Sequence, residues 1–231
     1  MRRLGVLISG RGSNLQAMID AIADGRLHAT IAVVISSRAD AAGLQRAAEA
    51  GIETLVCSPK SYADRAACDR AIAEALRDRA VDLVCLAGYM RLVGAPILDA
   101  FPEKILNIHP SLLPAFPGLD AQAQALAHGV CVSGATVHLV TAGLDDGPIV
   151  MQAAVPVCDE DTADTLAARI LVEEHRIYPA AIEAVLSGGW TVEGRRFRRA
   201  ATAPTAPVQD GSSALSVSTA TSGGQFKRTG T

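Results

Sequence analysis

The chain has 231 residues, of which 49% are hydrophobic, and its formal net charge at pH 7 is −3. This length and apolar content suffice for one domain with a buried core and an appendage. The mildly acidic balance argues against a nucleic-acid partner, which needs a basic face, but allows a small phosphorylated ligand bound by backbone N–H groups.

The five cysteines are odd in number and widely spaced, without a Cys-x-x-Cys pattern. This usage predicts buried, reduced thiols and no metal site. No apolar run reaches the roughly 18 residues of a membrane span. Met1-Arg2-Arg3 leads directly into a short apolar strand, unlike a secretory signal. We therefore expect a cytoplasmic protein without membrane contact.

In the first half of the chain, short β-rich runs alternate with helical patterns, which predicts a mainly parallel, Rossmann-like doubly wound α/β sheet. Ser61, with Asp64 three residues later, forms a capping-box pattern at the start of one helix. The expected strands are Leu4–Ser9, Ala29–Ser36, Glu53–Val56, Leu83–Leu86 and Ile105–Ile108, and the expected helices are Asn14–Asp24, Ala41–Ala50 and Ser61–Arg79.

The second half predicts an antiparallel strand pair, because a loop rather than a crossover helix joins two β-rich runs. One helix is expected at Ala121–His128, and a longer one at Ala163–Ser187 is expected to be interrupted near Pro179. The two strands are expected at Val132–Val140 and Ile149–Val157, around a turn region at Thr141–Pro148.

From about Ala200 the residues are mostly Ala, Thr, Ser, Gly and Pro. Such a segment buries too little apolar surface to offset the entropy lost on ordering. We expect residues 1–199 to form the catalytic domain and residues 200–231 to form a disordered, low-complexity tail.

A glycine-rich loop, Ser9–Asn14, joins the first strand to the first helix. Two glycines allow close approach of the backbone, and the helix N-terminus offers unpaired N–H groups to an anion, which indicates a phosphate site. An ordinary turn capped by Ser13 or Asn14 is the alternative. The loop lacks the third glycine of a dinucleotide fingerprint, since Leu15 stands there, and lacks the Gly-Lys-Ser/Thr of a P-loop.

Two other strands end in unusual loops. In Ala87–Leu92, Gly88 permits a sharp turn, and Met90 and Leu92 could line an apolar slot, although ordinary core residues at a strand end are the simpler interpretation. Asn107 and His109 lie on one face of their strand by alternation. A pair of hydrogen-bonding side chains at a carboxyl end suits an active site, whereas a lone histidine is often structural.

These segments together resemble the glycinamide ribonucleotide formyltransferase family over roughly residues 4–198. Each motif alone is modestly specific, and the five in the family's order are strongly specific: LISGRGSNLQA, LAGYMRL, ILNIHPSLLPAFPG, SGATVHLV and LDDGPIVMQAAVPV. The resemblance implies transfer of the formyl group of 10-formyltetrahydrofolate, a co-substrate, to the amine of glycinamide ribonucleotide in de novo purine biosynthesis. It implies small-molecule substrates, no metal, and a monomer or homodimer.

The resemblance also implies roles for particular residues. The catalytic trio matches Asn107, His109 and Asp145, the last in the acidic loop Leu144–Pro148 that would otherwise be interpreted as a simple turn. Asn107 and a protonated His109 would stabilise the oxyanion, and Asp145 would support the imidazolium and take up the amine proton. Acceptor binding matches Gly12, Ser13 and Asn14 for the phosphate and Glu174 for the ribose, while donor binding matches Arg65, Met90, Arg91, Leu92 and Thr141.

Two positions depart from the family pattern. Asp120 follows Phe-Pro-Gly-Leu where several members carry histidine, and Leu171 stands where some members have a polar side chain near the substrate. We therefore expect one ligand contact from each of these positions to be missing.

Other functions share parts of this pattern. Methionyl-tRNA formyltransferases carry an additional C-terminal tRNA domain, and formyltetrahydrofolate hydrolases carry an N-terminal regulatory domain, and we expect neither here. A non-catalytic nucleotide-binding module would explain the glycine loop but not the Asn-His pair or the acidic loop. A Ser111 nucleophile activated by His109 lacks the usual Gly-x-Ser-x-Gly setting.

Overall fold

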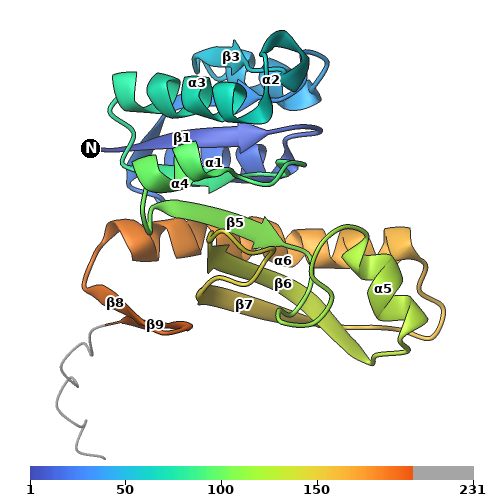
Figure 1. Cartoon of the computed structure of the whole chain (residues 1–231). Coiled ribbons are helices and arrows are strands. Elements are labelled where there is room, and N and C mark those ends of the chain that lie inside the picture. The colour runs from blue at the N-terminus through green and yellow to red at the C-terminus, as the bar shows by residue number, and fades with distance from the viewer. Residues whose placement is uncertain (200–231) are drawn as a thin grey trace, which may run out of the picture. The chain divides into compact units, whose positions relative to one another are not determined.

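One sheet of nine strands runs through the structure, a computed structural model that describes residues 1–199 (Figure 1). Its strand order is β3-β2-β1-β4-β5-β6-β7-β9-β8. The disordered tail expected at residues 200–231 lies outside the described residues.

The first five strands run parallel, and the sixth pairs antiparallel with both the fifth and the seventh as the chain turns back. The predicted mainly parallel sheet with an antiparallel pair in the C-terminal half is confirmed. The strands are β1 (Arg2–Ile8), β2 (Ala29–Ser36), β3 (Thr54–Val56), β4 (Leu83–Leu86), β5 (Ile105–His109), β6 (Val132–Leu139) and β7 (Ile149–Pro156).

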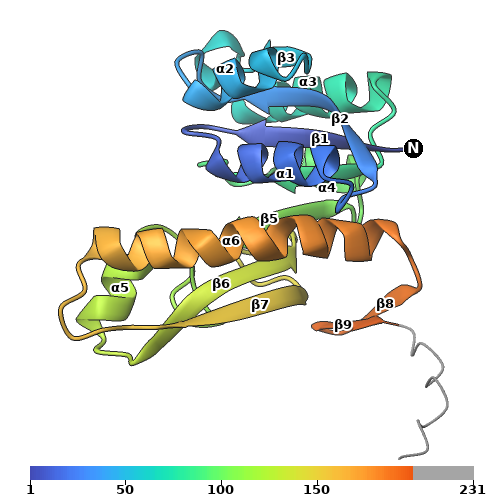
Figure 2. The ribbon, with the colours of Figure 1, turned by 180° about the vertical axis from the view of Figure 1, so that it is seen from behind.

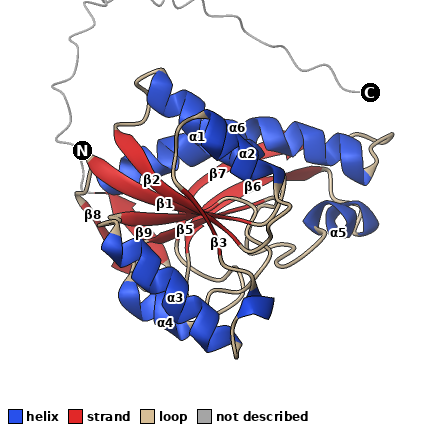
Figure 3. Ribbon diagram, turned by 90° about the horizontal axis from the view of Figure 1, so that it is seen from above, coloured by secondary structure: helices blue, strands red, loops and turns tan. Residues whose placement is uncertain are grey.

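Helices cover both faces of the sheet, so the central strands are apolar on both sides. Residues 4–8 of β1 are all buried for this reason. Helices α1 (Ser13–Ala23), α2 (Ala42–Glu49) and α6 (Ala163–Leu186) lie on one face, and α3 (Arg65–Asp78) and α4 (Ala95–Ala100) lie on the other (Figures 2 and 3). The buried apolar residues accordingly form two clusters, one on each side of the sheet.

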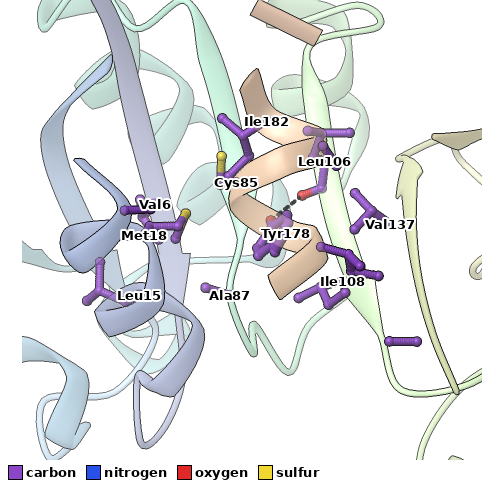
Figure 4. Packing of buried hydrophobic residues seen from close by; sticks show 14 of the residues in the cluster. Val6, Leu15, Met18, Cys85, Ala87, Leu106, Ile108, Val137, Tyr178 and Ile182 are labelled. Carbon is purple, nitrogen blue, oxygen red and sulfur yellow. Dashed lines mark hydrogen bonds between the residues drawn. The ribbon is translucent and has the colours of Figure 1, made fainter. Parts of the chain in front are cut away.

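Helix α6 is continuous, so the interruption predicted near Pro179 is wrong. Proline removes one backbone donor, but here it lies between Tyr178 and Ile182, which are fully buried against the sheet and hold the helix in place (Figure 4). The Tyr178 hydroxyl lies 3.0 Å from the carbonyl oxygen of Leu86 and 3.1 Å from that of Leu106. This hydroxyl ties α6 to the last residue of β4 and to the second residue of β5.

The capping box predicted at Ser61 is also wrong. Pro59–Ser61 forms a short 3₁₀ turn, Tyr62 is extended, and α3 starts only at Arg65. Asp64 is the N-cap itself, because its carboxylate accepts the N–H of Ala67 at 2.6 Å.

Three short elements were not predicted: α4 and the hairpin of β8 (Trp190–Glu193) and β9 (Arg196–Arg199). Helix α4 has only six residues, too few for a helical period to be recognised. In the hairpin, the rings of Trp190 and Phe197 stack with centroids 5.0 Å apart.

The expected burial of the cysteines is confirmed for Cys57, Cys68 and Cys85, whereas Cys131 and Cys158 are exposed. No helix within residues 1–199 is long and apolar enough to cross a membrane.

Candidate active site

The three residues expected to be catalytic lie together at the carboxyl end of β5. The loop between β6 and β7 folds back over this end and brings in Asp145. Its Oδ1 atom lies 3.4 Å from Nδ2 of Asn107, and its Oδ2 atom lies 3.3 Å from Nδ1 of His109. The fold therefore joins one amide, one imidazole and one carboxylate in a single cluster.

The imidazole of His109 lies between two oxygen atoms and is almost fully buried, with 5% of the side chain exposed. Nε2 lies 2.8 Å from the carbonyl oxygen of Phe116, and Nδ1 faces the carboxylate of Asp145. A carbonyl and a carboxylate only accept hydrogen bonds, so the ring satisfies both partners when both nitrogens carry protons. This geometry suits an imidazolium.

The carboxylate of Asp145 is held from several sides. It accepts the N–H of Gly118 at 2.8 Å, in addition to its contacts with Asn107 and His109. Burial alone would raise the pKa of Asp145, but His138, the Gly118 N–H and the charge of His109 outweigh it and hold the pKa below its usual value. The backbone of Asp145 has φ 49°, a conformation that is uncommon outside glycine. The loop is therefore shaped to deliver an ionised carboxylate.

His138 is a member of this cluster that the sequence did not reveal. It lies on β6 directly opposite Asn107, and 2% of its side chain is exposed. Its Nδ1 donates to the carbonyl oxygen of Leu139 at 2.9 Å, and its Nε2 lies 3.1 Å from Nδ2 of Asn107 and 3.6 Å from Oδ1 of Asp145. His138 thereby contacts both the amide of Asn107 and the carboxylate of Asp145. A single histidine in an otherwise apolar strand paired with the Asn-x-His strand is the signal that could have found it.

The loop after β5 supplies the Phe116 carbonyl and the Gly118 N–H, and Thr136 on β6 holds this loop. The hydroxyl of Thr136 donates to the carbonyl oxygen of Ser111 at 2.6 Å and accepts the N–H of Leu113 at 3.0 Å. The hydroxyl of Ser111 donates to Ala115 O at 2.5 Å, away from the ring nitrogens of His109. This arrangement contradicts the idea of a Ser111 nucleophile.

The glycine-rich loop ends at the N-terminus of α1, where Gly12 is the N-cap and no side chain caps the helix. Gly12 has φ 72°, and a Cβ atom there would lie 2.6 Å from Cα of Gly43. The alternative of a cap by Ser13 or Asn14 is therefore wrong, and the first-turn N–H groups face outward uncapped. A cleft of about 310 Å³ lined by Ser13, Gln16 and Arg46, among others, adjoins this helix end.

Asn14 and Glu174 form a buried polar pair between α1 and α6. Nδ2 of Asn14 donates to Oε2 of Glu174 at 2.7 Å, and only 7% and 8% of the two residues are exposed. Burial raises the pKa of Glu174, although the Asn14 hydrogen bond and the charge of Arg11 oppose it. Oδ1 of Asn14 has no hydrogen-bond partner within residues 1–199. The side-chain amide of Asn14 thus points to Glu174, so an anion at the glycine loop would meet only its backbone N–H.

The residues expected to bind the donor lie around the loop after β4. Met90 and Leu92 are exposed, at 67% and 53%, while the side chain of Arg91 is directed into the protein and is 16% exposed. Arg65 on α3 donates to the carbonyl oxygen of Leu92 at 2.6 Å. Thr141 lies apart from them in the loop after β6, where its hydroxyl is exposed and donates to Asp146.

Residues 2–182 match the sequence profile of the formyl transferase family. The chain belongs to this family. A phosphoribosylglycinamide formyltransferase from Bacillus subtilis is 44% identical over 186 residues, which cover 80% of this chain and 95% of that protein. A glycinamide ribonucleotide transformylase 1 structure from Symbiobacterium toebii is 61% identical with a TM-score of 0.85, covering 86% of this chain and 94% of that one.

The chain also resembles one part of larger proteins. The trifunctional purine biosynthetic protein adenosine-3 of Bos taurus is 50% identical over 186 residues, 80% of this chain but 18% of that protein. The chain thus spans less than a fifth of the length of this relative.

The two departures from the family pattern both lie at helix positions. Asp120 is the N-cap of α5 (Ala121–Ala127), has φ 55°, and makes no side-chain cap bond. Leu171 lies on α6 one turn before Glu174 and is partly buried. Within residues 1–199, no group of three or more His, Cys, Asp or Glu side chains is arranged to hold a metal ion.

Proposed function

We propose that the chain is a phosphoribosylglycinamide formyltransferase whose catalytic domain is residues 1–199. It transfers the formyl group of 10-formyltetrahydrofolate to the amine of N1-(5-phospho-D-ribosyl)glycinamide, producing the N-formyl product and tetrahydrofolate in de novo purine biosynthesis. The observation that carries the proposal is the buried cluster of Asn107, His109 and Asp145. Relatives with this name match nearly their whole length, which supports it.

The reaction needs three kinds of help, and the cluster offers each of them. The formyl oxygen becomes an oxyanion when the amine attacks, and Asn107 and protonated His109 are N–H donors for it. One preorganised donor of this kind contributes about 3–4 kcal/mol in other enzymes. Asp145 stabilises the imidazolium and accepts the proton that the attacking amine must lose. This proton then passes, directly or through water, to the leaving nitrogen of the donor, so that the bond from the formyl carbon to that nitrogen breaks and tetrahydrofolate is released.

The observed contacts add one step to this scheme. Both ring nitrogens of His109 already face protein oxygens, Phe116 O on one side and Asp145 on the other. Donation to the formyl oxygen therefore requires the ring to exchange its partner at Phe116. We infer that substrate binding shifts the loop after β5, because the Phe116 carbonyl belongs to that loop whereas the Asp145 carboxylate is the ionised partner of the ring.

Acceptor recognition is assigned to the other end of the site. The uncapped first turn of α1, Gly12 to Asn14, suits a phosphate, because its N–H groups and the helix dipole favour an anion. Glu174 is placed to accept from ribose hydroxyls, together with the unpartnered Oδ1 of Asn14. The donor is assigned to the apolar surface of Met90 and Leu92, with contacts from Arg65 and Thr141, while the side chain of Arg91 is directed into the protein.

Two other functions use much of the same geometry. A formyltetrahydrofolate hydrolase would use the trio with water as the acceptor, and it would have no need for an open anion site at the glycine loop. A nucleotide-binding module would use the glycine loop and would have no need for a buried Asn-His-Asp cluster.

One assay separates the three. The protein is incubated with 10-formyltetrahydrofolate, with and without the ribonucleotide, and the absorbance of the folate is followed. The proposal expects turnover only when the ribonucleotide is present. Equal turnover without it would identify a hydrolase, and ribonucleotide binding by folded protein without turnover would identify the binding module.

A further inference from the structure

Asp69 in α3 is a buried carboxylate to which the mechanism proposed above gives no role. It is 1% exposed and lies among the apolar residues that join α3 to the sheet. A buried carboxylate is costly unless charges and hydrogen bonds compensate for the lost water. Its partners therefore indicate what it does.

All the partners of Asp69 point to the loop after β4. Its Oδ2 atom accepts the N–H of Gly94 at 3.1 Å and lies 3.9 Å from Nε of Arg65. Its Oδ1 atom lies 3.8 Å from Nη2 of Arg91. Burial raises the pKa of Asp69, while the two arginines and the Gly94 N–H lower it.

These partners fasten the second half of the loop. Arg65 also donates to Leu92 O at 2.6 Å, and Arg91 donates to Cys68 Sγ at 3.3 Å. A Cβ atom at Gly94 would overlap the carboxylate of Asp69, so glycine allows the close approach. One carboxylate thus anchors Arg91, Leu92 and Gly94 in a segment that has no regular secondary structure.

The fastening leaves two large apolar side chains facing water. Met90 and Leu92 flank the inward-turned Arg91 and are 67% and 53% exposed. The backbone at Met90 is also held in place, because its N–H donates to the hydroxyl of Ser9 at 3.0 Å. Neighbouring exposed apolar side chains on an anchored backbone are typical of a ligand surface.

We propose that Asp69 is a positioning residue for the formyl donor, acting through Arg65, Arg91 and Gly94 to hold Met90 and Leu92 against the folate. The proposal rests on the proposed function. It also gives Arg91 a different role from a direct ligand contact: its guanidinium is an internal strut between α3 and the loop.

The test compares Asp69→Asn with the parent enzyme and with Glu74→Gln, a matched loss of one acid at an exposed position of the same helix. Steady-state kinetics give kcat and separate KM values for donor and acceptor, and calorimetry gives Kd for tetrahydrofolate. Asp69→Asn keeps an acceptor for the Gly94 N–H but loses the charge that holds the arginines. We expect its donor KM and tetrahydrofolate Kd to rise about tenfold, with the acceptor KM within about twofold of the parent.

A second variant guards against simple loss of folding. Asp69→Asn combined with Arg91→Met removes both charges, so neither is left buried without its partner. We expect this double variant to recover thermal stability but to keep the raised donor KM.

Two results would overturn the inference. One is a folded Asp69→Asn enzyme with parental donor KM and tetrahydrofolate affinity. The other is a double variant in which restored stability also restores the donor KM, which would make Asp69 purely structural. If the parent shows no formyl transfer, the proposed function fails instead, and the tetrahydrofolate Kd still tests the loop.

Discussion

The catalytic end and the acceptor end of the site differ in how many of their polar side-chain atoms have hydrogen-bond partners within the protein. Around Asp145, the side chains of Asn107, His109 and His138 all have partners, and the carboxylate also accepts a backbone N–H. Around Asn14, a buried oxygen has no partner within residues 1–199, and the helix behind it is uncapped. The buried Nε2 atom of His175 on α6 is equally unpartnered there.

This contrast indicates a division of labour. The side chains of the cluster hold one another in place before substrate arrives, so the reaction requires only that His109 exchange Phe116 O for the formyl oxygen. Polar groups left open at the acceptor end gain their hydrogen bonds only from the ligand, so they favour binding. Substitutions at the first end are therefore expected to lower kcat, and those at the second end to raise KM.

Asp145→Asn is expected to have the largest effect. The amide keeps the size of the side chain but loses the charge that pairs with His109 and the site that accepts a proton. We expect kcat to fall by about 10³-fold, within the range for general acid–base groups, while acceptor affinity measured by calorimetry stays within about twofold. A kcat close to that of the parent would remove Asp145 from the mechanism.

The same carboxylate gives a pH prediction. The pKa of Asp145 is lowered in the folded protein, so its ionised form stabilises the fold above the pKa of the unfolded chain, and this stability is lost as pH falls through the folded value. Thermal unfolding followed from pH 7 to pH 3 should therefore show a smaller acid loss of stability in Asp145→Asn than in the parent. Parallel curves for the two proteins would contradict the lowered pKa.

His109→Ala is expected to have the next largest effect, a loss of about 10²-fold in kcat. The donor surface at Met90 and Leu92 belongs to another loop, so donor KM should change little. A large loss of donor affinity with kcat intact would make His109 a binding residue and would contradict the assignment of this end of the site to catalysis. Steady-state kinetics with each substrate varied in turn make the distinction.

The sequence predicted the fold and the catalytic residues better than the residues that hold them in position. The doubly wound order and the Asn-x-His strand follow from local patterns, since alternation and strand–helix spacing can be read along the chain. His138 and Asp69 could not be found that way. The role of each depends on a partner in a different element, Asn107 for one and Arg91 for the other.

The two errors in the helices have different origins. The buried neighbours of Pro179 keep α6 continuous, whereas at the start of α3 the N-cap is Asp64 itself and not Ser61. Local propensity is a weak guide where a helix is held by a buried face. The resemblance located Asp145, whose acidic loop alone indicates only a turn.

Glu174→Gln tests the acceptor end and is expected to raise acceptor KM about tenfold with little change in kcat. The pKa of Glu174 is raised by burial, so the folded state holds its proton more tightly than the unfolded chain, and the ionised form costs stability at neutral pH. Gln still accepts the N–H of Asn14, so we expect Tm at pH 7 to be unchanged or higher. Glu173→Gln, one position earlier and paired with Arg176 at the surface, is the matched control. A fall in kcat without a change in acceptor KM would mean that Glu174 acts in catalysis and not in binding the acceptor.

Tyr178→Phe is expected to have the smallest effect, and it asks whether the two ends are coupled. The hydroxyl joins α6, which carries Glu174, to Leu106 of β5, the residue before Asn107 (Figure 4). Loss of this hydrogen bond should lower the free energy of unfolding by about 1 kcal/mol in urea titrations. Ile182→Val, one turn along the same helix, should cost a similar amount through lost packing.

If the ends act independently, neither variant changes kcat or acceptor KM by more than about twofold. An acceptor KM that rises only in Tyr178→Phe would instead mean that the hydroxyl sets the distance between Glu174 and the trio, because the two variants would then differ in geometry and not in stability.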